Sequence, residues 1–208
     1  MKILLMIFFL INFILYSQIS PDFEIKSAQR LEKLKKLQEE IIPIAIIPFK
    51  NDSKNMFADK ILFKWFRKSF KNKGFSIPDY TTIKTKLRKE DISTLMKIRK
   101  SQLINFGRKY GLKYIIYGKI TKFKAYKKFK LGNFIIFPIG LGQILYGEIK
   151  FKVQVLDVSA GEIIYRKEIY SMKKNQVGGL FQGKGAVQNR NLKEVMAELK
   201  EELYKVMK

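Results

Sequence analysis

The sequence predicts an α/β fold: one mixed sheet of about five strands with helices packed on it. Three observations support this fold class. Short runs rich in β-branched residues alternate with segments whose apolar residues recur at helical spacing. The last strands follow one another with no helix between them. The element order is therefore strand, helix, strand, helices, three strands, helix, which is typical of a mixed sheet.

Each element follows from composition and periodicity. Strands are expected at 41–49, 75–79, 113–121, 148–158 and 162–170. Helices are expected at 58–70, from 79 or 81 to 88, from 93 to 110, and at 192–205. The first strand is apolar on both faces, as in a buried strand. The fourth alternates cleanly and pairs with the fifth across a Ser-Ala-Gly turn.

Helical spacing and capping residues define the helices. The first helix of the domain has an apolar stripe that includes Trp65 and Phe66, so we expect both in the core. Ser93 is the expected cap of the helix that Gly111 closes. Asn191 is the expected cap of the last helix, because a glutamate follows it at capping-box spacing.

Two segments do not fit this alternation and are expected to be insertions beside the sheet. Residues 131–147 are apolar and interrupted by proline and glycine, which disfavours a regular central strand. Residues 177–186 are glycine-rich and nearly match a phosphate-binding loop, but Gly185 replaces the Ser or Thr that binds magnesium. We also expect the last helix to begin too late to hold a phosphate.

The amino terminus has the three regions of a secretory signal. A lysine precedes an apolar run that is too short to span a bilayer comfortably, and Ser17 offers a small residue for cleavage. We expect residues 1–17 to be a signal peptide, 18–40 an N-terminal helix or linker, and 41–208 a single α/β domain with the apolar insertion. An uncleaved membrane anchor is the alternative interpretation.

Composition excludes several functional classes. The 208 residues contain no cysteine and no histidine, which removes disulfides, thiolate metal sites, a lipidated cysteine and the commonest general base. We expect no catalytic residue, cofactor or metal. The net charge of +24 indicates anionic partners, although an A+T-rich genome is an alternative source of so many lysines. Nucleic acid is disfavoured, because an exported protein rarely meets it.

Three segments together resemble a superfamily of bacterial envelope proteins. IAIIPFKNDS (44–53) is similar to its first strand and loop, FGRKYGLKYIIYGKI (106–120) to its helix–glycine–strand element, and VQVLDVSAGEIIYRKE (153–168) to its closing hairpin. The superfamily includes the curli-secretion-channel (CsgG-like) lipoproteins and the lipoprotein activators of penicillin-binding proteins. The resemblance implies a periplasmic or outer-membrane α/β domain that works through protein contacts. This chain departs from it by lacking a lipobox cysteine and a clear pair of pore-forming hairpins.

The apolar insertion is the expected contact site for a partner or a membrane. Its contact residues are Phe134, Ile135, Ile136, Phe137, Ile139, Leu141, Ile144, Leu145 and Tyr146. The lysines nearby form the expected basic surface: Lys122, Lys124, Lys127, Lys128 and Lys130. An exposed apolar patch beside such charges suits a partner or anionic headgroups, and the alternative is an edge hairpin folded onto the core.

These observations predict an exported, non-enzymatic envelope protein in the periplasm or at the outer-membrane periphery of a bacterium. It would act as an adaptor or assembly factor through contact with an envelope protein or with itself. The alternative is a peripheral protein held to an anionic membrane or wall polymer by charge. Salt separates the two, because charge-driven binding weakens with ionic strength.

Overall fold

The computed structural model describes residues 29–30, 41–71, 74–92, 98–129, 143–177 and 184–208. The chain divides into two units, Met1–Ile41 and Ile42–Lys208. In the first unit, Gln29 and Arg30 are helical and exposed. The expected signal peptide lies outside the described residues. Within the part of the chain that is described, no helix has both the length and the apolar character needed to cross a membrane.

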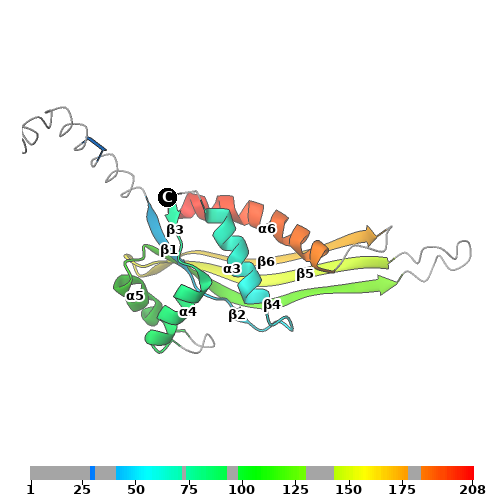
Figure 1. Cartoon of the computed structure of the whole chain (residues 1–208), viewed down its shortest axis with the longest axis horizontal. Helices are drawn as coiled ribbons and strands as arrows, with labels where there is room; N and C mark the ends of the chain where they lie inside the picture. Colours follow the sequence, from blue (N-terminus) through cyan, green and yellow to red (C-terminus); the bar gives the residue numbers. More distant parts are fainter. Residues whose placement is uncertain (1–28, 31–40, 72–73, 93–97, 130–142, 178–183) are drawn as a thin grey trace, which may run out of the picture. The chain divides into compact units, whose positions relative to one another are not determined.

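The second unit is a mixed six-stranded sheet with four helices packed on it (Figure 1), which confirms the predicted fold class. The strands are β1 (Ile42–Ile46), β2 (Lys50–Asn51), β3 (Phe75–Ser76), β4 (Tyr114–Phe129), β5 (Gln143–Asp157) and β6 (Glu162–Val177). The helices are α3 (Ala58–Phe70), α4 (Tyr80–Lys89), α5 (Lys100–Lys109) and α6 (Lys184–Met207).

The sheet joins a parallel half to an antiparallel half. Its strand order is β3-β1-β4-β5-β6, and the short β2 also pairs with β4. β1 runs parallel to both β3 and β4, with Ile44 opposite Tyr114. β4, β5 and β6 form an antiparallel meander. α3, α4 and α5 lie between parallel neighbours because such strands need crossover connections, whereas a meander needs only turns, and α6 follows the meander.

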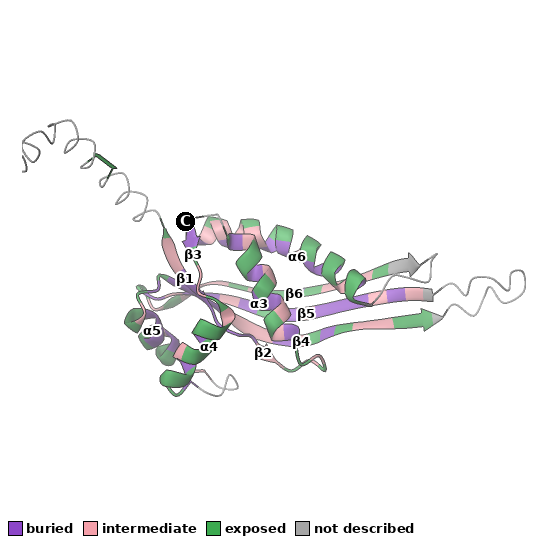
Figure 2. Cartoon of the chain, in the orientation of Figure 1, coloured by how far each residue is buried: buried purple, intermediate pink, exposed green. Residues whose placement is uncertain are grey.

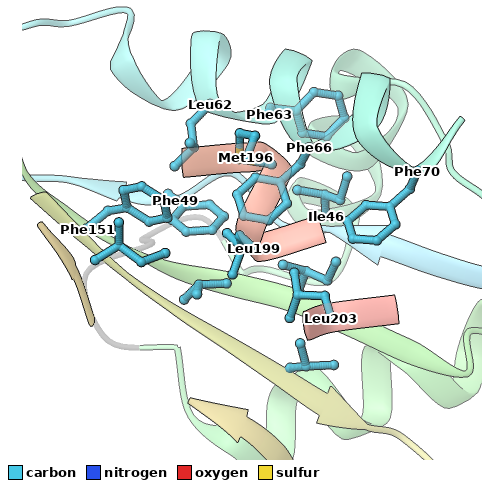
Figure 3. Close-up of a cluster of buried hydrophobic side chains, with 14 of the residues drawn as sticks. Ile46, Phe49, Leu62, Phe63, Phe66, Phe70, Phe151, Met196, Leu199 and Leu203 are labelled. Atoms are coloured by element: carbon cyan, nitrogen blue, oxygen red, sulfur yellow. The ribbon is translucent and has the colours of Figure 1, made fainter. Parts of the chain in front are cut away.

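Aromatic residues fill the core between the sheet and α3 and α6. Phe49, Phe66 and Phe151 are fully buried. The rings of Phe49 and Phe66 stack with their centres 5.4 Å apart, and Phe151 meets both rings edge-on (Figure 3). Burying one such side chain contributes about 1.5–3 kcal/mol. This cluster therefore ties the parallel strands and the meander to the same two helices.

A second, smaller core lies on the opposite face of the sheet, under α4 and α5. It includes Ala45 of β1, Ile115 of β4 and Leu156 of β5, all fully buried. Partly buried Tyr117 and Ile163 pack at its margin. The two cores place α3 and α6 on one face of the sheet and α4 and α5 on the other (Figure 2).

Two predicted helix ends are confirmed. Asp79 caps α4, and its carboxylate accepts the backbone N–H of Thr82 at 2.8 Å. Gly111 follows α5 in the left-handed conformation, with φ of +63°. A residue with a side chain adopts this conformation only with strain, so glycine suits the turn into β4.

Other predicted boundaries and positions differ in the structure. α5 begins at Lys100 with Arg99 as its cap, whereas Ser93 lies outside the described residues. Trp65, which was expected in the core, is half-buried on the flank of α3 and packs against that core. The last helix begins at Lys184, so Asn191 is not its cap but a buried residue inside it.

Asn191 fixes α6 to the meander. Its side-chain N–H groups donate to the carbonyl oxygens of Gly147 at 2.9 Å and Ser171 at 3.2 Å. Gly147 lets the helix approach, since a Cβ there would lie 3.0 Å from a methyl group of Val187. The side-chain oxygen of Asn191 has no hydrogen-bond partner among the described residues. The position of α6 thus depends on the buried amide of Asn191 and on the absence of a Cβ at Gly147.

Candidate functional site

The three strands of the meander continue well beyond their predicted ends. β4 and β6 each have 16 residues, and β5 has 15. β5 begins at Gln143, which pairs with Phe129 on one side and with Val177 on the other. Residues 143–147 therefore belong to a regular strand, not to an insertion. Figure 1 shows these strands running together past α3.

A β-bulge at Thr121 decides which side chains of β4 share a face. The pairing register with β5 shifts between Ile120 and Lys122. As a result Ile120 and Phe123 both enter the core under α3 and α6, where simple alternation would have placed Lys122. Lys122 and Lys124 point to the opposite side of the sheet.

On that opposite side, the core under α4 and α5 ends at Tyr117, Leu156 and Ile163. Beyond it the outward side chains of the meander form a surface that we name the open face. Its members are Lys122, Lys124, Tyr126, Lys128, Ile144, Tyr146, Glu148, Lys150, Lys152, Glu168, Tyr170, Met172 and Lys174. The open face therefore carries lysine and tyrosine in excess and two carboxylates.

Each carboxylate of the open face binds two lysines from the neighbouring strand. Glu148 on β5 lies 2.7 Å from the Nζ of Lys122 and 3.0 Å from that of Lys124. Glu168 on β6 lies 2.8 Å from the Nζ of Lys150 and 3.4 Å from that of Lys152. The two sites differ in burial, since the Glu148 side chain is 6% exposed and that of Glu168 is 42% exposed. These pairs hold the lysine stems in place across the sheet.

Three tyrosines and a methionine lie next to Glu148, and we name them the tyrosine cluster: Tyr126, Tyr146, Tyr170 and Met172. The rings of Tyr126 and Tyr146 stack nearly parallel with centres 5.2 Å apart. The hydroxyls of Tyr126 and Tyr170 each lie 3.9 Å from the sulfur of Met172. Lys128 lies over both stacked rings, at 5.9 and 5.4 Å from their centres. Tyr170 is 56% exposed and Met172 50% exposed, so the cluster presents apolar surface to water.

The two carboxylates provide a matched test of the open face. Hydrogen bonds from Lys122 and Lys124 hold the pKa of Glu148 below its ordinary value, although burial opposes them. The ionised form is therefore the stabilising one above pH 4.5, and its contribution is lost as pH falls through the lowered folded-state pKa. Glu148→Gln should lower the free energy of unfolding at pH 7 by about 1 kcal/mol.

Urea unfolding followed by circular dichroism at pH 7 and at pH 3 measures this effect. The Glu148→Gln difference should shrink at the acid pH, because the contribution of the ionised carboxylate is lost as the pH falls through its lowered pKa. Glu168→Gln is the control, because the same two-lysine pairing there is more exposed and screened by salt. An equal loss of unfolding free energy in both variants, independent of pH, would contradict the stabilising role assigned to the ionised Glu148 carboxylate.

The residues of the predicted contact site separate into three groups. Ile144 and Tyr146 lie half-buried on the open face, whereas Leu145 points to the other face and is 1% exposed, so it belongs to the core. The rest lie outside the described residues: Phe134, Ile135, Ile136, Phe137, Ile139 and Leu141.

The predicted basic surface is also divided. Lys122, Lys124 and Lys128 are exposed on the open face. Lys127 is exposed on the opposite side of β4, and Lys130 lies outside the described residues. Three of the five lysines are thus brought together with Tyr146, a predicted contact residue.

Sequence reasoning missed Glu148, Tyr126, Tyr170 and Met172 as members of the site. A signal for them was present, because open-face residues recur at every second position on each strand. Tyr126 stands between Lys124 and Lys128 at that spacing. The pattern becomes readable only once the strands are known to continue that far.

The near-match to a phosphate-binding loop needs one correction. α6 begins at Lys184, so the expectation that the helix begins several residues later is wrong. Gly185 still stands where the motif requires a hydroxyl for magnesium. Among the described residues, no group of three or more acidic side chains is arranged to hold a metal ion.

No family model matches the chain, and no curated protein matches its sequence. Solved structures do match it. Lipoprotein GNA1162 from Neisseria meningitidis is 9% identical with a TM-score of 0.51, covering 77% of this chain and 99% of that one. The LpoB C-terminal domain from Salmonella enterica is 12% identical with a TM-score of 0.42, covering 62% and 82%. A PelC dodecamer from Paraburkholderia phytofirmans is 12% identical with a TM-score of 0.41, covering 77% and 90%. The chain thus shares the fold of Lipoprotein GNA1162, and the resemblance drawn from its sequence is confirmed for the fold.

Proposed function

We propose that this chain is an exported, non-enzymatic adaptor or assembly factor of the bacterial envelope that docks an envelope protein on the open face. The tyrosine cluster is the observation that supports this most. Tyrosine and methionine are enriched at the centres of protein interfaces, and tyrosine often supplies the residues that dominate binding energy. The fold shared with Lipoprotein GNA1162 supports a place in the envelope.

The surroundings of the cluster favour a protein partner with carboxylates at its rim. Lys128 lies over both stacked rings, Lys124 over that of Tyr126, and Lys122 lies 5.9 Å from the ring of Tyr170. Binding orders few additional groups, because Lys122 and Lys124 are already held by Glu148. An aromatic centre with a charged rim gives both affinity and orientation.

Site-specific photo-crosslinking in the native envelope tests this proposal. A photoreactive residue in place of Tyr170 should give a discrete adduct with an envelope protein, and one in place of exposed Arg88 on α4, outside the open face, should not. The double variant Tyr170→Ser/Met172→Ser should weaken partner capture about 30-fold or more, the size of losing a dominant interface residue. Met56→Ser/Phe57→Ser removes an exposed apolar pair elsewhere and should leave capture unchanged.

Salt identifies the binding mode. At 1 M salt the screening length is about 3 Å, so binding by charge alone is lost whereas docking through the tyrosine cluster persists. No adduct from position 170, or the same adduct from positions 170 and 88, would contradict docking on the open face. Complete loss at 1 M salt would instead favour attachment by charge to an anionic envelope surface.

A further inference from the structure

The loop between β2 and α3 holds two large apolar side chains in water. Met56 is 78% exposed and Phe57 is 60% exposed, and they are neighbours in the chain. Single exposed apolar residues are normal on a protein surface. An adjacent pair is less so, and this pair stands at the end of the loop, where α3 begins.

Hydrogen bonds fix this loop in its shape. The side-chain amide of Asn51 donates to the carbonyl oxygen of Asn55 at 2.7 Å, and the Ser53 hydroxyl donates to the side-chain oxygen of Asn51 at 2.6 Å. The backbone N–H of Phe57 donates to the side-chain oxygen of Asn55 at 3.0 Å. Because the loop is braced, Met56 and Phe57 are held out and do not fold back onto the domain.

The apolar surface continues from the loop along one flank of α3. Phe57, Ile61 and Trp65 recur at a spacing of four residues, so they lie on the same side of the helix. Ile61 and Trp65 line a half-open groove of about 490 Å³, which Phe123 of β4 also lines. The apolar strip therefore runs from the exposed pair Met56 and Phe57 into a groove beside the sheet.

Exposed basic side chains surround this strip. They are Lys54, Lys60, Lys64, Arg67, Lys68 and Lys71. The acidic residue of this segment is Asp59, which accepts a hydrogen bond from the Tyr80 hydroxyl at 2.6 Å. Lys64 and Lys68 line the groove, and the Nζ of Lys68 lies 5.6 Å from the ring centre of Trp65. An apolar strip with a cationic border requires an occupant that is apolar inside and anionic outside.

We propose that the α3 flank, defined as Met56, Phe57, Ile61, Lys64, Trp65 and Lys68, docks on an anionic phospholipid membrane. Met56 and Phe57 would enter the boundary between headgroups and acyl chains, a depth at which tryptophan is also favoured. The lysines would meet the lipid phosphates. α3 packs on the face of the sheet opposite the open face, so the domain can contact a membrane and a protein partner at the same time.

The sequence contains a reporter for this surface, because Trp65 is its single tryptophan. The full chain is titrated with vesicles of phosphatidylcholine mixed with phosphatidylglycerol, and with phosphatidylcholine alone. Mixed vesicles should shift the Trp65 emission to shorter wavelength, and brominated lipid should quench it. This signal comes from the α3 flank, so attachment of the apolar amino-terminal run to the vesicles does not produce it.

Three double variants separate the apolar and electrostatic contributions to membrane binding. The quantity measured for each variant is the lipid concentration at the titration midpoint. Met56→Ser/Phe57→Ser should weaken binding by about 10-fold or more. Lys64→Glu/Lys68→Glu should weaken it by about 30-fold or more. Arg88→Glu/Lys89→Glu makes the same change in net charge on α4, across the sheet, and should bind as the unaltered chain does. Circular dichroism verifies that all three variants are folded.

An unchanged Trp65 emission with mixed vesicles would overturn the proposal. Equal weakening by Arg88→Glu/Lys89→Glu would overturn it too, because attraction would then depend on total charge and not on the α3 flank. Tyr170→Ser/Met172→Ser should leave the vesicle titration unchanged. Failure of membrane docking and failure of partner docking on the open face are thus separate results.

Discussion

Gly118→Ala should lower the free energy of unfolding by about 3 kcal/mol or more, the upper range for forcing extra atoms into a packed core. Gly118 lies in β4 opposite Val153 of β5. A Cβ at this position would lie 1.9 Å from the carbonyl oxygen of Lys152 and 2.6 Å from the ring of Phe49. Neither neighbour can move freely, because one is strand backbone and the other stacks on Phe66.

Gly185→Ala is the matched control for this substitution. Gly185 lies near the start of α6, and a Cβ there would have no neighbour within 4 Å. Alanine in a helix is favoured over glycine by up to about 1 kcal/mol, so this variant should be as stable as the unaltered chain or slightly more stable. Urea unfolding measures both variants. Equal stability of Gly118→Ala and the unaltered chain would contradict the close approach of β4 and β5.

Local signals predicted the elements whose residues determine their own conformation. α3 begins and ends where the apolar stripe places it. The turn between β5 and β6 was predicted at Ser159–Gly161, and Gly161 has a φ of +68° there. Asp79 caps α4 through a hydrogen bond to Thr82. In each case the residues that determine the conformation are close together in the sequence, so the sequence pattern alone predicts it.

The lengths of the strands were not predictable in the same way. The bulge at Thr121 shifts the alternation of β4 by one residue. Lys127 then lies on the same face as Phe123, yet it is exposed. Two features thus hide the alternation of β4 from Lys122 to Lys128, the bulge and the incomplete cover of the strand beyond Phe123, and neither can be read from the residues alone.

The open face could not be predicted from neighbouring residues either. Glu148 stands beside Lys122 and Lys124 only because β4 and β5 pair over their whole length. Tyr126 and Tyr146 meet by the same register. Sequence alone predicted Tyr146 and the lysines as contact residues but placed Leu145 with them, because an irregular segment has no faces to distinguish.

Asn191 is the clearest case of a local signal overruled by distant partners. As a capping residue it would satisfy the first N–H groups of a helix. Its partners are instead the carbonyl groups of Gly147 and Ser171 on two different strands. Sequence spacing could not reveal them. The buried amide therefore belongs to the contact between α6 and the meander, and substituting it should disturb that contact.

Asn191→Asp should lower the free energy of unfolding by about 3–5 kcal/mol at pH 7, because it places an unpaired charge in a fully buried position. The new carboxylate would replace the amide N–H groups that face the carbonyl oxygens of Gly147 and Ser171. Asn191→Ala removes the same hydrogen bonds without adding charge and should lower the stability by about 1–3 kcal/mol.

The pH dependence of the two variants distinguishes charge from lost hydrogen bonds. Burial raises the folded-state pKa of an aspartate above its unfolded value of about 3.9. The acid then binds its proton more tightly when folded, so the charge contribution to the loss in Asn191→Asp should be complete above the raised pKa and disappear progressively below it. The loss in Asn191→Ala should stay constant. Urea unfolding of both variants and the unaltered chain at pH 7 and pH 3 measures the difference. A pH-independent loss in Asn191→Asp would show that residue 191 reaches water and that α6 is not seated on β5 and β6 as described.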